Sequence, residues 1–221
     1  MTRDGYMNWA LLSALFLASV HCGGNEDASS SMQLEPEQFY ATELVSYDPG
    51  PGAGFGQDQL PDIVLGPPDG RGPEAGGLDV LSLGQGGSIV LGFGDSVIID
   101  GPGPDFIVFE NPFWVGGDST NVFAELGQVE VSEDGQTWVG FSCNVDTREG
   151  CAGWQPPLPF ESASVVPPEL EICGGDGFDL ADLDLSMARF VRVTDLGEND
   201  ASPSAGFDLD AVAIIHRSTM N

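Results

Sequence analysis

Residues 101–111 read Gly101-Pro-Gly-Pro-Asp-Phe-Ile-Val-Phe-Glu-Asn111, and the pattern of this stretch recurs along the chain. The first four residues predict a turn, because proline fixes φ and glycine tolerates positive φ. The aromatic and β-branched run that follows predicts a buried strand over residues 105–109. Acidic residues bracket this strand at both ends.

Short runs of the same kind alternate with Gly, Pro and Asp clusters on both sides, and no long segment has helical periodicity. Glu133-Asp-Gly-Gln136 predicts a β-hairpin, because Gly135 can take positive φ at little steric cost. The other predicted strands are residues 88–93, 96–99, 122–132, 137–142, 188–195 and 207–216. We therefore expect one all-β, antiparallel β-sandwich domain over residues 41–217.

The first 40 residues predict export. Residues 10–20 are apolar but too few to span roughly 30 Å of hydrocarbon as a helix, so we predict a signal peptide over residues 1–21. The region around Cys22 resembles the cleavage site of bacterial lipoproteins, in which this cysteine is lipidated. Ordinary signal-peptidase cleavage nearby is the alternative. Residues 22–40 are small, polar and acidic, which predicts a flexible tether to the outer membrane or cell surface of a Gram-negative bacterium.

Residues 143–177 differ from the rest of the chain because proline pairs interrupt them, and proline lacks the donor that a central strand needs. We expect a long insertion loop there. Trp154 and Phe160 within it are candidates for ligand contact, or else they cover the end of the sandwich.

Three cysteines follow Cys22, an odd number in a compartment where disulfides persist. Cys143 and Cys151 flank a short polar loop and are the expected disulfide pair. Cys173 could take either partner, or it could remain a small buried apolar residue.

The formal net charge is −29 at pH 7, and the chain contains no lysine. Removal of residues 1–21 takes away Arg3 and Asp4 together, so the exported chain keeps this charge. A strongly negative surface repels nucleic acid and anionic lipid, whereas it attracts divalent cations and basic partners. We expect no nucleic-acid partner.

Enzymatic chemistry has little support in the residues. After export His216 is the one histidine left, and no nucleophile elbow, zinc-binding spacing or phosphate-binding glycine loop is present. A carboxylate pair of the kind used in glycoside hydrolysis is formally available, but among so many acids it has little diagnostic weight. We predict that the protein is not an enzyme.

Some acidic side chains are predicted to point inward. Strand alternation along residues 123–131 places Glu125 on the same face as Phe123 and two valines. In the last strand it places Asp208 and Asp210 on the face of the apolar residues that follow. An inward carboxylate needs a counter-ion, and arginines are too few to supply one for each.

Calcium meets this need, because it takes six to eight oxygen ligands from carboxylates, amides and carbonyls. Solvated acids with Arg189 or Arg192 as a partner are the alternative. Carbonyls of residues 101–104 and the loop at 174–179 are further candidate ligands. The primary predicted ligands are Asp105, Glu110, Asn111, Glu125, Asp208 and Asp210.

Two longer stretches resemble a known fold family. Val129-Glu-Val-Ser-Glu-Asp-Gly-Gln-Thr-Trp138 and Ala188-Arg-Phe-Val-Arg-Val193 are similar to the strand pair of discoidin-type, galactose-binding-like jelly rolls. Leu65-Gly-Pro-Pro-Asp-Gly70 resembles their early Asp-Gly loop, which in several members lies near the ligand or calcium end. The resemblance implies an eight-stranded jelly-roll sandwich.

A second resemblance is to a family of uncharacterised bacterial cell-surface lipoproteins, over roughly residues 45–216. It implies secretion and supplies no activity. The extreme acidity and the proline-rich insertion depart from sugar-binding jelly rolls. The matching segments are residues 101–111, 123–126, 177–182 and 206–212.

These observations favour a non-catalytic, calcium-stabilised adhesion or recognition module at the cell surface, with a carbohydrate or a surface protein as its ligand. A structural envelope lipoprotein without a small-molecule ligand is the alternative.

Overall fold

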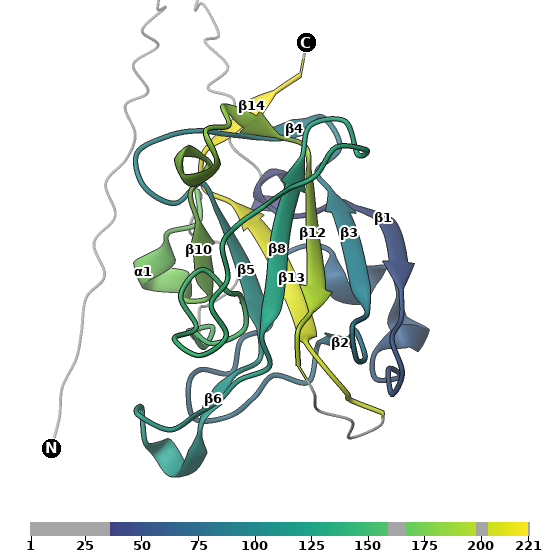
Figure 1. Cartoon of the computed structure of the whole chain (residues 1–221), viewed down its shortest axis with the longest axis vertical. Helices are drawn as coiled ribbons and strands as arrows, with labels where there is room; N and C mark the ends of the chain where they lie inside the picture. Colours follow the sequence, from purple (N-terminus) through teal and green to yellow (C-terminus); the bar gives the residue numbers. More distant parts are fainter. Residues whose placement is uncertain (1–35, 159–166, 198–202, 221) are drawn as a thin grey trace, which may run out of the picture. The chain divides into compact units, whose positions relative to one another are not determined.

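Two antiparallel sheets face each other across one apolar core in the computed structural model, which describes residues 36–158, 167–197 and 203–220. The predicted all-β, antiparallel sandwich is confirmed, and Figure 1 shows β8 and β12 of one sheet overlying β5 and β13 of the other. The predicted signal peptide, Cys22, Phe160 and most of the predicted tether lie outside the described residues.

The larger sheet has the strand order β1-β3-β12-β8-β9. In β12 buried valines alternate with more exposed residues, because only one face of this strand packs on the core. The outward Arg192 pairs with Glu130 of β8 at 2.6 Å. The strand bounds are Glu43–Asp48 for β1, Ser88–Gly92 for β3, Phe190–Asp195 for β12, Gly127–Ser132 for β8 and Val139–Gly140 for β9.

The second sheet has the order β10-β5-β13-β2, and β5 and β13 are buried on both faces. Phe106 and Val108 of β5 enter the central core, whereas Ile107 and Phe109 enter a second apolar cluster. Burial on both sides explains why β5 is a continuous apolar run. The bounds are Asp176–Phe178 for β10, Phe106–Glu110 for β5, Asp208–Ile214 for β13 and Leu81–Ser82 for β2.

Smaller elements complete the described part of the chain. A three-stranded sheet contains β11 (Met187–Ala188), β4 (Ser96–Ile99) and β14 (Arg217–Thr219), and β6 (Phe113–Trp114) pairs with β7 (Val122–Phe123). The helices are α1 (Leu170–Cys173) and the short 3-10 helices η1 (Pro36–Phe39), η2 (Gln57–Gln59), η3 (Asp62–Val64), η4 (Val115–Gly117) and η5 (Leu180–Leu183).

Several predicted strands are shorter or interrupted. The segment predicted as one strand over 122–132 is two strands, β7 and β8, separated by residues 124–126. Residues 188–195 are likewise split between β11 and β12. The hairpin at 133–136 is present, since β8 pairs with β9 and Gly135 has φ of 72°.

The expected insertion loop is partly regular. Residues 143–177 contain α1 and the start of β10, which pairs with β5 along the edge of the second sheet. The disulfide between Cys143 and Cys151 is present, and Cys173 is a buried free cysteine.

The folded part extends beyond residues 41–217 at both ends. Phe39 and Tyr40, which fall in the predicted tether, are buried in the second apolar cluster. At the other end, β14 continues to Thr219 and pairs with β4. Among the described residues, no helix has the length and apolar character needed to cross a membrane.

Candidate metal centre

The six predicted calcium ligands do not meet at one place, because β5 separates them. Asp105 precedes this strand and Glu110 ends it. A five-residue strand spans roughly 16 Å at about 3.3 Å per residue, so the two carboxylates cannot bind the same ion.

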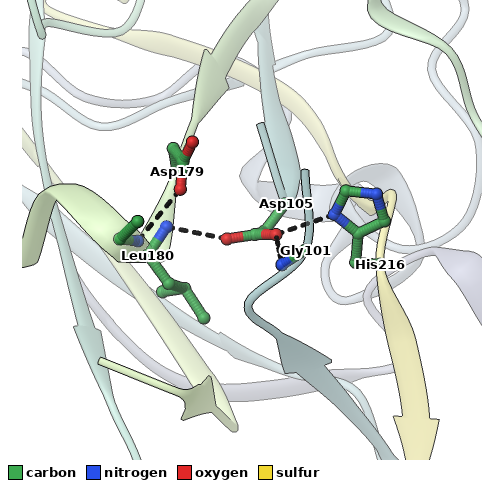
Figure 2. A network of polar contacts seen from close by, with 6 residues as sticks. Gly101, Asp105, Asp179, Leu180 and His216 are labelled. Atoms are coloured by element: carbon green, nitrogen blue, oxygen red, sulfur yellow. Dashed lines mark hydrogen bonds and ion pairs between the residues drawn. The ribbon is translucent and has the colours of Figure 1, made fainter. Parts of the chain in front are cut away.

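Asp105 lies in a hydrogen-bond network at the first end of β5 (Figure 2). Its Oδ1 accepts the N–H of Gly101 and contacts Nδ1 of His216, both at 2.8 Å, and its Oδ2 accepts the N–H of Leu180 at 2.7 Å. A Cβ at residue 101 would clash with the His216 ring, so the close approach of the imidazole requires glycine there. Both oxygens of this fully buried carboxylate therefore have protein partners.

Asp100 and Asp179 also lie near Asp105, with one carboxylate oxygen from each of the three within 4.8 Å of the others. Asp179 accepts the N–H of Ala181 at 2.9 Å and caps η5. The carboxylates at this end of β5 mainly hold chain segments together through hydrogen bonds. His216 belongs to this network, although the sequence did not predict it there.

Glu110, Glu125 and Asp208 form a second group at the other end of β5, which we call the carboxylate cluster. One carboxylate oxygen from each lies within 4.8 Å of the others, and the three residues are 1%, 6% and 7% exposed. Glu110 Oε2 and Asp208 Oδ1 are buried and lack a hydrogen-bond partner. This is the combination from which a cation site is built.

Burial disfavours the charged form of these carboxylates. It raises the pKa of Glu110 well above its ordinary value, and the charges of Asp208 and Glu125 add to the effect. Burial also raises the pKa of Asp208 to about 6, against the opposing hydrogen bonds from Ser82 and Asn111. The side chain of Asn111 thus lies beside the cluster, and its Nδ2 donates to the carbonyl of Gly77 at 3.0 Å.

Arginines do not supply the missing charge. In the part of the chain that the structure describes, no ion pair reaches Glu110 or Asp208. Arg192 pairs with Glu130 instead, and the guanidinium of Arg189 lies over the ring of Phe190.

A hollow of about 320 Å³ opens beside the cluster and gives it a route to solvent. Asn111, Glu125 and Asp208 line it, together with Phe113 and Phe123. Two of the three carboxylates, Glu125 and Asp208, therefore border a space that can hold a small cation.

Asp210 lies apart from this cluster because of a β-bulge in β13. The register with β5 shifts between Leu209 and Ala211, so the alternation of side chains changes there. Phe207 and Leu209, on either side of Asp208, both point into the central core, so Asp208 points away from it. Val212 and Ile214 also belong to that core. The prediction that the two aspartates share a face with Val212 and Ile214 is therefore wrong.

Asp210 itself is 3% exposed. Its Oδ1 accepts the N–H of Asp69 at 3.2 Å, and its Oδ2 has no partner. The loop at residues 65–70, which contains the Asp-Gly motif, therefore contacts β13. The sequence did not predict this particular contact.

Glu125 is buried as predicted, but it does not share a buried face with Phe123. Phe123, expected on the same inward face, is 44% exposed and stacks on Phe113 with ring centroids 5.3 Å apart. Glu125 lies in the break between β7 and β8, where strand alternation does not apply.

The predicted contact residue Trp154 is partly exposed and lies in a third region, beside β10. Its backbone N–H donates to Oδ2 of Asp176 at 3.1 Å, and that oxygen also accepts the N–H of Gly153 at 2.7 Å. Burial raises the pKa of Asp176 to about 7, against these hydrogen bonds. Asp176 lies in the loop at 174–179, which was predicted as a source of further calcium ligands, but its role as an acceptor for this backbone was not predicted.

The chain matches no protein-family model, and a search of curated proteins found no match either. The case for a function therefore depends on the chemistry of the site.

Proposed function

We propose that this protein is a non-catalytic, calcium-stabilised recognition module displayed at a bacterial cell surface. The observation that carries this proposal is the carboxylate cluster with two buried, unpartnered oxygens. A buried carboxylate without a partner costs several kcal/mol when it is ionised. A divalent cation among the three carboxylates offsets that cost and lets them ionise at neutral pH.

Calcium suits the donors of this site better than a softer metal. The cluster offers carboxylate oxygens, and the amide of Asn111 lies beside it, whereas histidine nitrogen and cysteine sulfur are not part of the group. Glu110, Glu125 and Asp208 come from three different segments of the chain. An ion shared among them holds the end of β5, the start of β8 and the start of β13 together.

The recognition part of the proposal is supported by the hollow beside the cluster and by the net charge of −29. Export, the lipid anchor at Cys22 and the surface location belong to the same proposal. Carbohydrate and surface proteins are the ligand classes expected from the sequence. A glycan array with calcium tests the first, and a silent array together with a crosslinked envelope protein would favour the alternative structural role.

Calcium content and calorimetric calcium titration of the purified full-length protein test the metal site. We expect tight calcium binding by the wild-type protein and at least tenfold weaker binding by Glu125→Gln and Asp208→Asn. The matched control is Asp146→Asn, which removes one exposed acid from the disulfide loop. A wild-type protein that binds no calcium, or variants that bind it as the control does, would refute the proposed site.

A further inference from the structure

A second hollow, of about 490 Å³, lies beside β10 and α1 and is separate from the carboxylate cluster. We call it the indole pocket, because Trp114 of β6 and Trp154 both line it. Leu158 and Leu170 add apolar surface, and the volume is in the range of small-molecule sites. Figure 1 shows α1 next to β10, at the edge of the second sheet.

Among the described residues, two charged side chains line the indole pocket, Glu171 of α1 and Asp176 of β10, and both are acidic. Elsewhere in the described chain, Arg192 pairs with Glu130 and Arg217 donates to Gln38. Together with the net charge of −29, the exposed carboxylate of Glu171 gives the pocket a negative potential. An anionic guest is therefore disfavoured and a cationic guest is favoured.

One carboxylate oxygen of Asp176 positions the pocket wall. It accepts N–H groups from Gly153, Trp154 and Gln155, at 2.7, 3.1 and 3.4 Å. These bonds fix the backbone that bears the Trp154 indole. A sugar ring needs several converging hydrogen-bond partners, whereas an organic cation needs aromatic faces and negative charge.

We propose that the indole pocket binds a small soluble organic cation, with a quaternary ammonium group held against the rings of Trp114 and Trp154 and Glu171 as the facing carboxylate. This site gives a ligand class to the recognition role and rests on that proposed function. A quaternary ammonium ion has no N–H to donate, so its binding does not require a hydrogen-bond acceptor in the pocket. Its attraction to an aromatic face amounts to about 0.5–2 kcal/mol per ring.

The test is a titration of the full-length protein with choline and with its neutral isostere 3,3-dimethylbutanol, followed by calorimetry and tryptophan fluorescence. We expect choline to bind at least tenfold more tightly than the isostere. Trp154→Ala and Trp114→Ala are each expected to weaken choline binding about 2- to 30-fold. Trp138→Ala is the matched control, because Trp138 lies against Arg192 outside the pocket.

Glu171→Gln keeps the test valid if a tryptophan variant fails to fold, because Glu171 is exposed. We expect several-fold weaker choline binding with unchanged unfolding temperature. Equal binding of choline and the isostere, stronger binding of galactose, or no binding of choline would each overturn the inference. Calcium binding is measured on the same samples: calcium without choline binding refutes this inference alone, and choline without calcium binding refutes the proposed metal site alone.

Discussion

At the scale of single residues, the buried carboxylates fall into two classes: those whose oxygens accept N–H groups of the protein, and those with an oxygen that has no donor. Asp105 and Asp176 accept several N–H groups, which stabilise the negative charge from within the protein. Glu110, Asp208 and Asp210 each keep a buried oxygen without a donor, and Glu110 and Asp208 lie together in the carboxylate cluster. Asp105 and Asp176 are therefore structural acceptors, whereas Glu110 and Asp208 are the pair whose open oxygens one cation can satisfy.

Asp105→Asn tests this division. In the wild-type protein, N–H groups of Gly101 and Leu180 donate to the Asp105 carboxylate. The NH₂ group of asparagine would face one of these donors and could not accept from it, so we expect the free energy of unfolding to fall by about 1–3 kcal/mol. Denaturant unfolding should show the same loss in calcium and in chelator. If Asp105→Asn instead removes the difference between calcium and chelator, Asp105 is a metal ligand and the division is wrong.

Asp176 predicts a pH dependence of stability. Its pKa is about 7 in the folded protein, above its ordinary value of 3.8, so the folded state holds this proton more tightly than the unfolded state. Stability from this group is therefore present at low pH and declines as pH rises between about 4 and 7. Asp176→Asn keeps an acceptor oxygen without the titration.

We expect Asp176→Asn to lose less stability than the wild-type protein between pH 5 and pH 7.5, when unfolding by urea is followed in chelator. Asp176→Ala is expected to cost about 2–3 kcal/mol at either pH, because buried N–H groups lose their acceptor. Parallel pH profiles for Asp176→Asn and the wild-type protein would show that the aspartate does not titrate as described.

At the scale of elements, the disulfide loop borders the indole pocket, since Gly150 and Cys151 line it. The bridge closes a loop of sequence separation 8, so its removal should cost about 2 kcal/mol. We expect the double variant Cys143→Ser, Cys151→Ser to melt at lower temperature and to bind choline more weakly, while it binds calcium as before. Loss of calcium binding would mean that the two sites are not independent.

The elements that the sequence predicted well are those with an unambiguous local pattern. β5 is an apolar run between turn residues, and Gly135 marks the hairpin between β8 and β9. β10 was missed because Asp176-Gly-Phe178 has no apolar alternation, and pairing with β5 holds it in the sheet. The bulge in β13 was missed because the residues around it read as an uninterrupted strand.

The sequence could predict which kinds of residue form the candidate site, but not which of the predicted ligands lie together. Glu110, Glu125 and Asp208 were among the predicted ligands, and the structure brings them together. Asp105 was predicted with them because it precedes an apolar strand, and Asp210 because strand alternation gave it the same face as Asp208. Their separation depends on strand length and on the bulge, which are properties of the folded sheet.

At the scale of the whole molecule, the net charge of −29 works against compactness, because like charges repel each other in the folded state. Monovalent salt screens exposed charges, but it cannot satisfy the buried oxygens of Glu110 and Asp208. A bound divalent ion acts at that buried position. Calcium should therefore stabilise the protein more than sodium chloride does at the same ionic strength.

The most direct test of the central claim is the thermal unfolding midpoint of the wild-type protein in saturating calcium and in excess EDTA at constant ionic strength. Calcium at 100 times its dissociation constant contributes about 2.7 kcal/mol, which corresponds to a midpoint about 6–10 °C higher for a chain of this size. We predict this shift for the wild-type protein and Asp146→Asn, and at most about half of it for Asp208→Asn, in which tenfold weaker binding leaves about 1.4 kcal/mol at the same calcium concentration. An identical midpoint in calcium and in EDTA would contradict a calcium-stabilised fold.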